Sequence, residues 1–141
     1  MSKFLIVSVL IAAVMNQSVS QVNEDCFGNY PDDLSKISDS ELGKAFRTLK
    51  NQNNSDCNKF NSDLSRIMKE LGDRLGDKDV SIKQLKAVMG KPDSHTDEQH
   101  VVKLNEGEEL WIYHWRGWHD WLYFVIQSKK VKRADWWFAF E

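Results

Sequence analysis

Aromatic residues are concentrated near the end of the chain, in residues 109–140, where the apolar residues form three separate runs. The runs occupy residues 110–115, 121–127 and 131–140. Polar turn sequences at residues 116–120 and 128–130 divide them. The runs are rich in aromatic and β-branched residues, which favour a pleated and half-buried surface. The pattern therefore predicts three antiparallel strands in a meander.

Both faces of the predicted strands are apolar. Side chains alternate along a strand, so Leu110 and Ile112 point to one face while Trp111, Tyr113 and Trp115 point to the other. The second strand repeats this arrangement, with Leu122, Phe124 and Ile126 opposed to Trp121, Tyr123 and Val125. Helices on one side of a sheet cover only one face. The other face therefore needs a second cover.

Three amphipathic segments with helical spacing precede the strands. The first follows Ser38, whose spacing to Glu41 is that of a capping box, and continues to about Lys50. The second begins at Ser55 or Asp56 and ends at Gly72 to Gly76. Its apolar stripe comprises Phe60, Leu64, Ile67, Met68, Leu71 and Leu75. The third helix runs from Ser81 to Gly90, and Pro92 prevents its continuation.

The order of these elements predicts an α+β domain. Helices in about residues 32–90 would pack on one face of a three- to four-stranded antiparallel sheet in about residues 99–141. Residues 101–104 form a weak candidate for the additional strand. About 120 residues remain after the leader described next, which is enough for one modest domain, residues 21–141.

The first twenty residues resemble a secretory signal peptide, with Lys3, an apolar run at residues 4–14, and Ser18 and Ser20 before the cleavage point. After cleavage we expect no membrane segment, and a vacuole lumen or the cell exterior as destination. Cys26 and Cys57 would be oxidised on this route, either to an internal disulfide or to crosslinks between neighbouring chains. Asn53, followed by Asn54 and Ser55, is a possible glycosylation site.

Charge and motifs narrow the function classes. Without the leader the chain has 18 basic and 21 acidic side chains, a net charge of −3, which argues against a nucleic-acid partner. The histidines are His95, His100, His114 and His119. His114 and His119 lie near Asp120, yet we interpret them as ordinary strand and corner residues. No nucleophile motif, metal-ligand set or phosphate loop occurs, so we predict neither an enzyme nor a cofactor or metal.

Two resemblances add to this interpretation. Residues 85–93 (LKAVMGKPD), followed by residues 110–113 (LWIY) and 122–126 (LYFVI), resemble the SmpA/OmlA-like domain, also seen in the halves of β-lactamase inhibitor proteins. That family includes envelope-assembly lipoproteins and enzyme inhibitors. The corner Trp115-Arg116-Gly117-Trp118-His119-Asp120 is similar to octin-type vacuolar crystal proteins of zygomycete fungi. This resemblance implies a structural protein that assembles into crystals acting as statoliths in gravity sensing.

The tryptophan-rich strands therefore have a predicted role in association. Aromatic side chains bury about 150–250 Å² each and are enriched in protein interfaces. We expect the protein to associate with itself through an aromatic surface made of Trp111, Tyr113, Trp115, Trp118, Trp121 and Tyr123. A secreted protein-binding or enzyme-inhibitor module is the alternative, and a carbohydrate-binding module ranks below it. A heterologous contact repeated head to tail would extend into a lattice.

Overall fold

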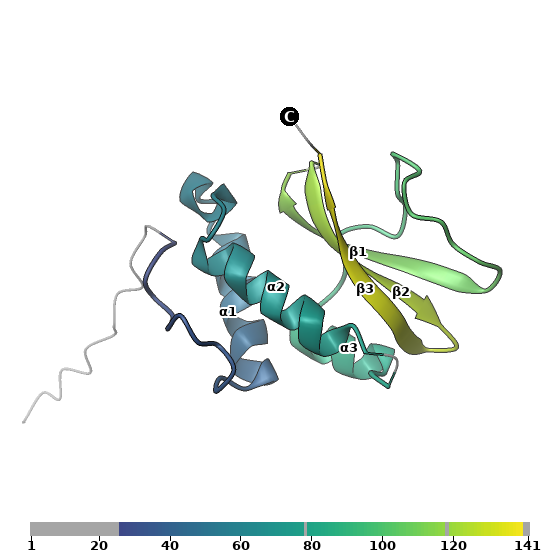
Figure 1. Cartoon of the computed structure of the whole chain (residues 1–141), viewed down its shortest axis with the longest axis horizontal. Helices are drawn as coiled ribbons and strands as arrows, with labels where there is room; N and C mark the ends of the chain where they lie inside the picture. Colours follow the sequence, from purple (N-terminus) through teal and green to yellow (C-terminus); the bar gives the residue numbers. More distant parts are fainter. Residues whose placement is uncertain (1–25, 78, 118, 140–141) are drawn as a thin grey trace, which may run out of the picture.

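The computed structural model describes residues 26–77, 79–117 and 119–139. The predicted signal peptide and Trp118 lie outside the described residues. The helices are α1 (Asp39–Asn51), the 3₁₀ helix η1 (Ser55–Asn58), α2 (Asp63–Leu75) and α3 (Ile82–Met89); the strands are β1 (Glu108–Arg116), β2 (Asp120–Gln127) and β3 (Lys130–Phe138). Figure 1 shows the helices together on one side of the sheet, which confirms the predicted α+β class. No helix among the described residues combines the length and apolarity needed to cross a membrane.

Two helices begin as their sequences predict. Ser38 caps α1 and Ser81 caps α3, and in each case the side chain three residues later returns a hydrogen bond to the capping residue. These reciprocal bonds satisfy amide groups that an isolated helix end leaves without partners. Helix α3 ends at Gly90, whose φ of 79° is accessible to glycine at little cost.

The segment predicted as one helix from Ser55 or Asp56 is interrupted. Helix η1 ends at Asn58, and α2 starts only at Asp63, after its cap Ser62. Asn61 between them has a φ of 64°, a left-handed conformation that asparagine tolerates better than most residues. Phe60 therefore lies in a turn with 60% of its surface exposed. Its placement on the buried helical stripe was wrong.

The three strands form an antiparallel meander in the order β1-β2-β3, as predicted. The register places Ile112 opposite Tyr123, and Leu122 opposite Trp136. Residues 101–104 do not form a strand. The carboxylate of Asp97 instead accepts the amides of Val101 at 2.6 Å and Val102 at 2.7 Å, and these bonds hold the backbone in a turn.

Neighbouring segments occupy part of both sheet edges. At the edge of β1, the amide of Ile112 donates to the carbonyl of Ser94 at 2.9 Å. At the start of β3, the amide of Val131 donates to the carbonyl of Val80 at 2.8 Å. Further along β3, the amide of Trp136 donates to the carboxylate of Asp135 at 2.8 Å. Several edge groups are thereby satisfied within the chain.

The sheet has one face beneath the helices, which we call the helix-covered face. It contains Trp111, Tyr113, Trp115, Leu122, Phe124 and Ile126, which pack with the apolar residues of α1, α2 and α3. The opposite, outer face contains Leu110, Ile112, Trp121 and Val125, with Tyr123 and Trp137 partly buried beside them. The predicted alternation of side chains is therefore confirmed.

The outer face is covered by the chain itself. The loop of residues 93–105, between α3 and β1, lies on the side of the sheet away from the helices (Figure 1). Val102 packs on the outer face, His95 Nδ1 lies 3.0 Å from the carbonyl oxygen of Leu110, and Arg133 donates to the carbonyl of Lys103 at 3.0 Å. The helices therefore cover one face of the sheet and this loop covers the other. The sequence pattern did not predict a role for this polar loop.

Candidate functional site: an aromatic groove

The six residues predicted for self-association do not form one exposed surface. Trp111, Tyr113 and Trp115 lie on the helix-covered face and are only 9%, 1% and 6% exposed. Trp121 is buried on the outer face, and Tyr123 beside it is partly buried. Trp118 lies outside the described residues. The single aromatic face is therefore corrected, because alternate residues of one strand belong to opposite faces.

Another aromatic surface lies where the start of α2 meets the end of β3. It is a groove of about 260 Å³, which we call the aromatic groove. Its residues are Phe60, Trp115, Trp136 and Phe138, with Asn61, Ser65, Arg66 and Lys69 along the α2 side. The Trp136 and Phe138 rings are stacked, with centroids 5.4 Å apart and planes 3° from parallel. The groove thus has one aromatic side and one polar side.

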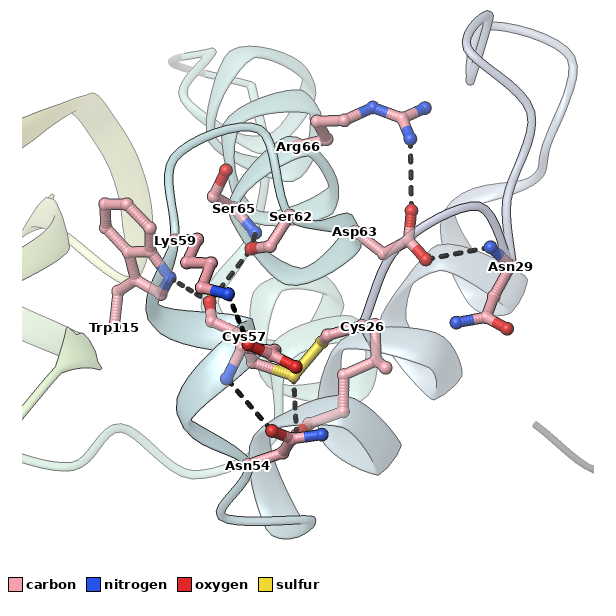
Figure 2. The surroundings of a disulfide bond; sticks show 12 residues. Cys26, Asn29, Asn54, Cys57, Lys59, Ser62, Asp63, Ser65, Arg66 and Trp115 are labelled. Carbon is pink, nitrogen blue, oxygen red and sulfur yellow. Dashed lines mark hydrogen bonds and ion pairs between the residues drawn. A yellow bond between two sulfur atoms is a disulfide. The ribbon is translucent and has the colours of Figure 1, made fainter. Parts of the chain in front are cut away.

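Trp115 forms the buried base of the aromatic groove. Its indole nitrogen donates to the carbonyl oxygen of Cys57 at 2.8 Å, and Figure 2 shows the ring directed at this oxygen. The hydroxyl of Ser62 donates to the same oxygen at 2.9 Å. The Cys57 carbonyl therefore links β1, η1 and the cap of α2. The short turn that carries Phe60 is fixed at both ends, because the Cys57 carbonyl before it accepts from Trp115 and from Ser62 after it.

The two cysteines form a disulfide within the chain, between Cys26 and Cys57. Both are buried, and no free cysteine occurs among the described residues. This result settles the alternative between an internal bond and crosslinks to neighbouring chains. The bond joins the N-terminal arm to η1, rather than to α2 itself (Figure 2).

A buried carboxylate strengthens the same junction. Asp63 accepts the amide of Asn29 at 2.9 Å and the guanidinium of Arg66 at 3.1 Å. Its own amide donates to the carbonyl of Cys26 at 2.7 Å. Because a buried charge requires partners that replace water, these bonds explain why Asp63 is tolerated in the interior. The arm and the first turn of α2 form one connected unit beneath Phe60.

The cations around the groove each have a carboxylate partner in the same chain. Arg66 pairs with Asp63, and Lys69 pairs with Asp73 at 2.8 Å. Arg116 pairs with Asp120, and its guanidinium carbon lies 4.9 Å from the centre of the Phe60 ring. Positive charges at such distances are attracted to the ring face. The rim of the aromatic groove is therefore polar but close to electrically neutral.

The corner that joins β1 to β2 is closed by Asp120. This buried carboxylate accepts the amide of Ala139 at 3.0 Å in addition to its pairing with Arg116. His119 at the corner is exposed, whereas His114 lies on the outer face near Ile112 and Trp121. The structure does not bring these residues into one ligand set. Among the described residues, no cluster of three or more side chains suited to a metal occurs.

Burial shifts the pKa values of His114 and Tyr113. Desolvation lowers the pKa of His114, with smaller opposing effects from Asp93 and Glu98 and a further lowering by Lys50. Desolvation also raises the pKa of Tyr113, whose hydroxyl donates to the carbonyl of Gly90 at 2.9 Å. Neither shift occurs in the aromatic groove.

The predicted glycosylation site is accessible. Asn53 is exposed in the turn after α1 and has a φ of 50°. The side chain of Asn54 accepts the amide of Asp56 at 2.9 Å and begins η1. Modification of Asn53 stays a prediction.

Comparison with known proteins adds no assignment. No protein-family model matches the chain, and neither a curated protein nor a solved structure matches it. The resemblances to the SmpA/OmlA-like domain and to octin-type crystal proteins therefore stay predictions. The functional interpretation depends on the geometry of the chain itself.

Sequence reasoning missed the role of three groove residues, Phe60, Trp136 and Phe138. Phe60 was assigned to a helix because its spacing to Leu64 is helical. The signal against this assignment is the polar, turn-forming sequence around it, with Asn58 before and Asn61-Ser62 after. For Trp136 and Phe138, alternation predicts a shared face but does not predict that the helices leave them partly exposed.

Proposed function

We propose that this is a non-enzymatic protein of the secretory pathway whose function is association with itself. The observation that carries the proposal is the aromatic groove with the exposed Phe60 at its side. Grouped apolar residues at a surface, rimmed by polar ones, are typical of interaction sites. Of the buried tryptophans on the helix-covered face, Trp115 contributes the base of the groove, and Trp111 has no part in the proposed contact.

The charge and redox properties of the chain support the proposal. The low net charge of the mature chain, −3, gives little repulsion between copies. The internal disulfide is compatible with an oxidising compartment. It also leaves no described cysteine for crosslinking, so we propose that assembly is non-covalent.

The resemblance to octin-type proteins supplies a specific form of assembly. We propose dense crystals in a vacuole lumen, which would act as statoliths in gravity sensing. A crystal needs more than one kind of contact between copies. Besides the groove, the exposed side chains of Val101 and Leu104 on the outer-face loop are candidates for a second contact. An extracellular location is the alternative destination.

A second candidate function is binding of another secreted molecule in the same groove. The observation that favours it is the combination of the stacked Trp136 and Phe138 rings with the polar side chains of Asn61 and Ser65 opposite. Such a groove fits an amphipathic partner, either a protein segment, as in an enzyme inhibitor, or a carbohydrate.

The test uses mature protein, residues 21–141, secreted with its disulfide formed. Light scattering and sedimentation velocity are measured between about pH 5 and 8 over a wide range of protein concentration. We expect reversible growth in mass with concentration, and chains that separate as monomers on a non-reducing denaturing gel. A protein that stays monomeric throughout contradicts the proposal. Quenching of tryptophan fluorescence by a polysaccharide, without self-association, favours the second candidate.

A further inference from the structure

We infer that two copies pair about a two-fold axis, with Phe60 of each copy inserted into the aromatic groove of the other. This inference rests on the proposed self-association and specifies its contact. It assigns Phe60 the role of an anchor residue and the rest of the groove the role of its receptor.

Phe60 has the properties of an anchor. It has the largest exposed fraction of the large apolar side chains among the described residues. The ring is nevertheless held in place, since it meets Trp115 edge to face at 5.1 Å and lies 6.2 Å from Phe138. Arg116 lies against the same ring. An anchor that is ordered before binding loses little conformational entropy when it binds.

The groove has room for such a ring. Its volume is about 260 Å³, whereas an apolar cavity of about 150 Å³ is sufficient to bind benzene in an engineered protein. Trp136 and Phe138 offer an aromatic wall, and an entering ring could meet them edge to face or offset. The phenyl group of a second copy is therefore an occupant of suitable size and chemistry.

The patch is also suited to pairing with itself. In a two-fold contact the same surface occurs on both sides, so one patch must carry both the inserted group and its receptor. Phe60 lines the groove that it would fill in the partner, which meets this requirement. Because Arg66, Lys69 and Arg116 are each paired with a carboxylate of their own chain, two such patches do not strongly repel.

The size of the patch predicts a weak dimer. Eight residues line the groove, whereas a stable interface uses about 20–30 residues on each side and about 800 Å² per partner. We therefore expect pairing that depends on concentration, with a dissociation constant of about 10 μM or higher at this interface size. Weak pairing of this kind is reversible.

The first test is sedimentation velocity of Phe60→Ser beside wild type. We expect the dimer dissociation constant to rise at least about 10-fold, since loss of a central aromatic anchor typically has this effect. The matched control is Phe27→Ser, which removes an exposed phenylalanine outside the groove and should leave the constant unchanged. Circular dichroism checks that each variant is folded. A Phe60→Ser protein that pairs as tightly as wild type overturns the inference.

The second test exploits the symmetry of the contact. Ser65→Trp fills the groove but keeps Phe60, whereas Phe60→Ser removes the anchor but leaves the groove open with its remaining walls of Trp115, Trp136 and Phe138. Each variant alone should pair at least about 10-fold more weakly than wild type. Their mixture should form heterodimers, because Phe60 of one variant can still enter the open groove of the other. No gain in association on mixing contradicts the two-fold arrangement.

The outcomes separate this inference from the proposed function. Wild type that is monomeric at every concentration overturns both. Wild type that assembles, together with variants that assemble equally well, overturns the contact described here and leaves self-association through another surface. Binding of a polysaccharide that Ser65→Trp abolishes, with no change in wild-type mass, assigns the groove to a different ligand and also overturns the inference.

Discussion

The two faces of the sheet are equally apolar but are covered in different ways. On the helix-covered face, Leu122 is 1% exposed and lies against Gly72 of α2, and on the outer face Leu110 is 2% exposed in a cluster with Val102 of the loop. The helices contribute stripes of large apolar side chains. The loop contributes few, and it is fixed largely by hydrogen bonds of its backbone and of Asp97. Equal burial can therefore result from unequal packing.

This difference revises an inference from strand patterns. A strand with two apolar faces indicates that both will be covered, but it does not indicate by what. Here a polar segment of the same chain covers the second face. The aromatic groove at the end of the sheet stays open instead, and Trp136 and Phe138 there are only partly buried.

The largest expected difference between the two faces concerns two buried leucines, one on each face of the sheet. We expect Leu122→Ala to lower the free energy of unfolding by about 4 kcal/mol and Leu110→Ala by about 2–3 kcal/mol, because a loop collapses into a cavity more readily than packed helices do. Chemical denaturation measures both. A larger loss for Leu110→Ala would show that the loop packs as rigidly as the helices.

Removal of the disulfide should have the next largest effect. The bond closes a loop with a sequence separation of 31 residues, and the chain-entropy model gives about 3–4 kcal/mol for a loop of this size. We expect this loss for the double variant Cys26→Ala/Cys57→Ala in thermal and chemical unfolding. The outer face lacks such a bond among its described residues. Hydrogen exchange should therefore increase first in η1 and the arm, and uniform exchange would contradict this localisation.

A smaller effect distinguishes two tryptophans of the helix-covered face. The indole of Trp115 donates to Cys57, whereas the buried indole nitrogen of Trp111 has no hydrogen-bond partner among the described residues. We expect Trp115→Phe to destabilise the protein by about 1–2 kcal/mol more than Trp111→Phe, since only the former loses a bond. Equal losses in urea denaturation would mean that ring volume alone determines stability at both positions.

The smallest predicted effect is pH dependence on the outer face. The pKa of His114 is lowered by burial, so the unfolded chain binds more protons than the folded chain below about pH 6.5. The stabilising contribution of neutral His114 is complete above that pH and decreases as the pH falls towards the folded pKa. The free energy of unfolding should differ less between pH 7.5 and pH 5.5 in the His114→Gln variant than in wild type. An unchanged difference would exclude His114 as its source.

Sequence patterns predicted the fold well where local signals and periodicity agree. The capping boxes at Ser38 and Ser81 begin helices, and alternation along β1 and β2 assigns each residue to its observed face. The failures occur where tertiary contacts decide. Residues 101–104 have an apolar pattern, but the carboxylate of Asp97 holds them in a turn. No periodic signal encodes such a contact.

The candidate site was harder to predict than the fold. The sequence identified the aromatic composition and the possible pairing of Cys26 with Cys57, but not which rings stay exposed. Exposure of Phe60 depends on the interruption of the helical segment at Asn61, and exposure of the groove depends on where α2 begins relative to the end of β3. The first has a local signal in the sequence around Asn61, whereas the second is a relation between distant segments. Alternation along a strand predicts which face of the sheet a side chain is on, but not which segment packs over that face.

The occupied sheet edges have a consequence for the fate of the chain at high concentration. Long aromatic strands with free edges are templates for amyloid, because their backbone groups recruit further strands. Here Ser94 and Val80 each bond to an edge strand, and the carboxylate of Asp135 takes the amide of Trp136. These contacts oppose fibril growth by strand addition. At high concentration the chain is therefore expected to keep its native fold rather than join its neighbours edge to edge.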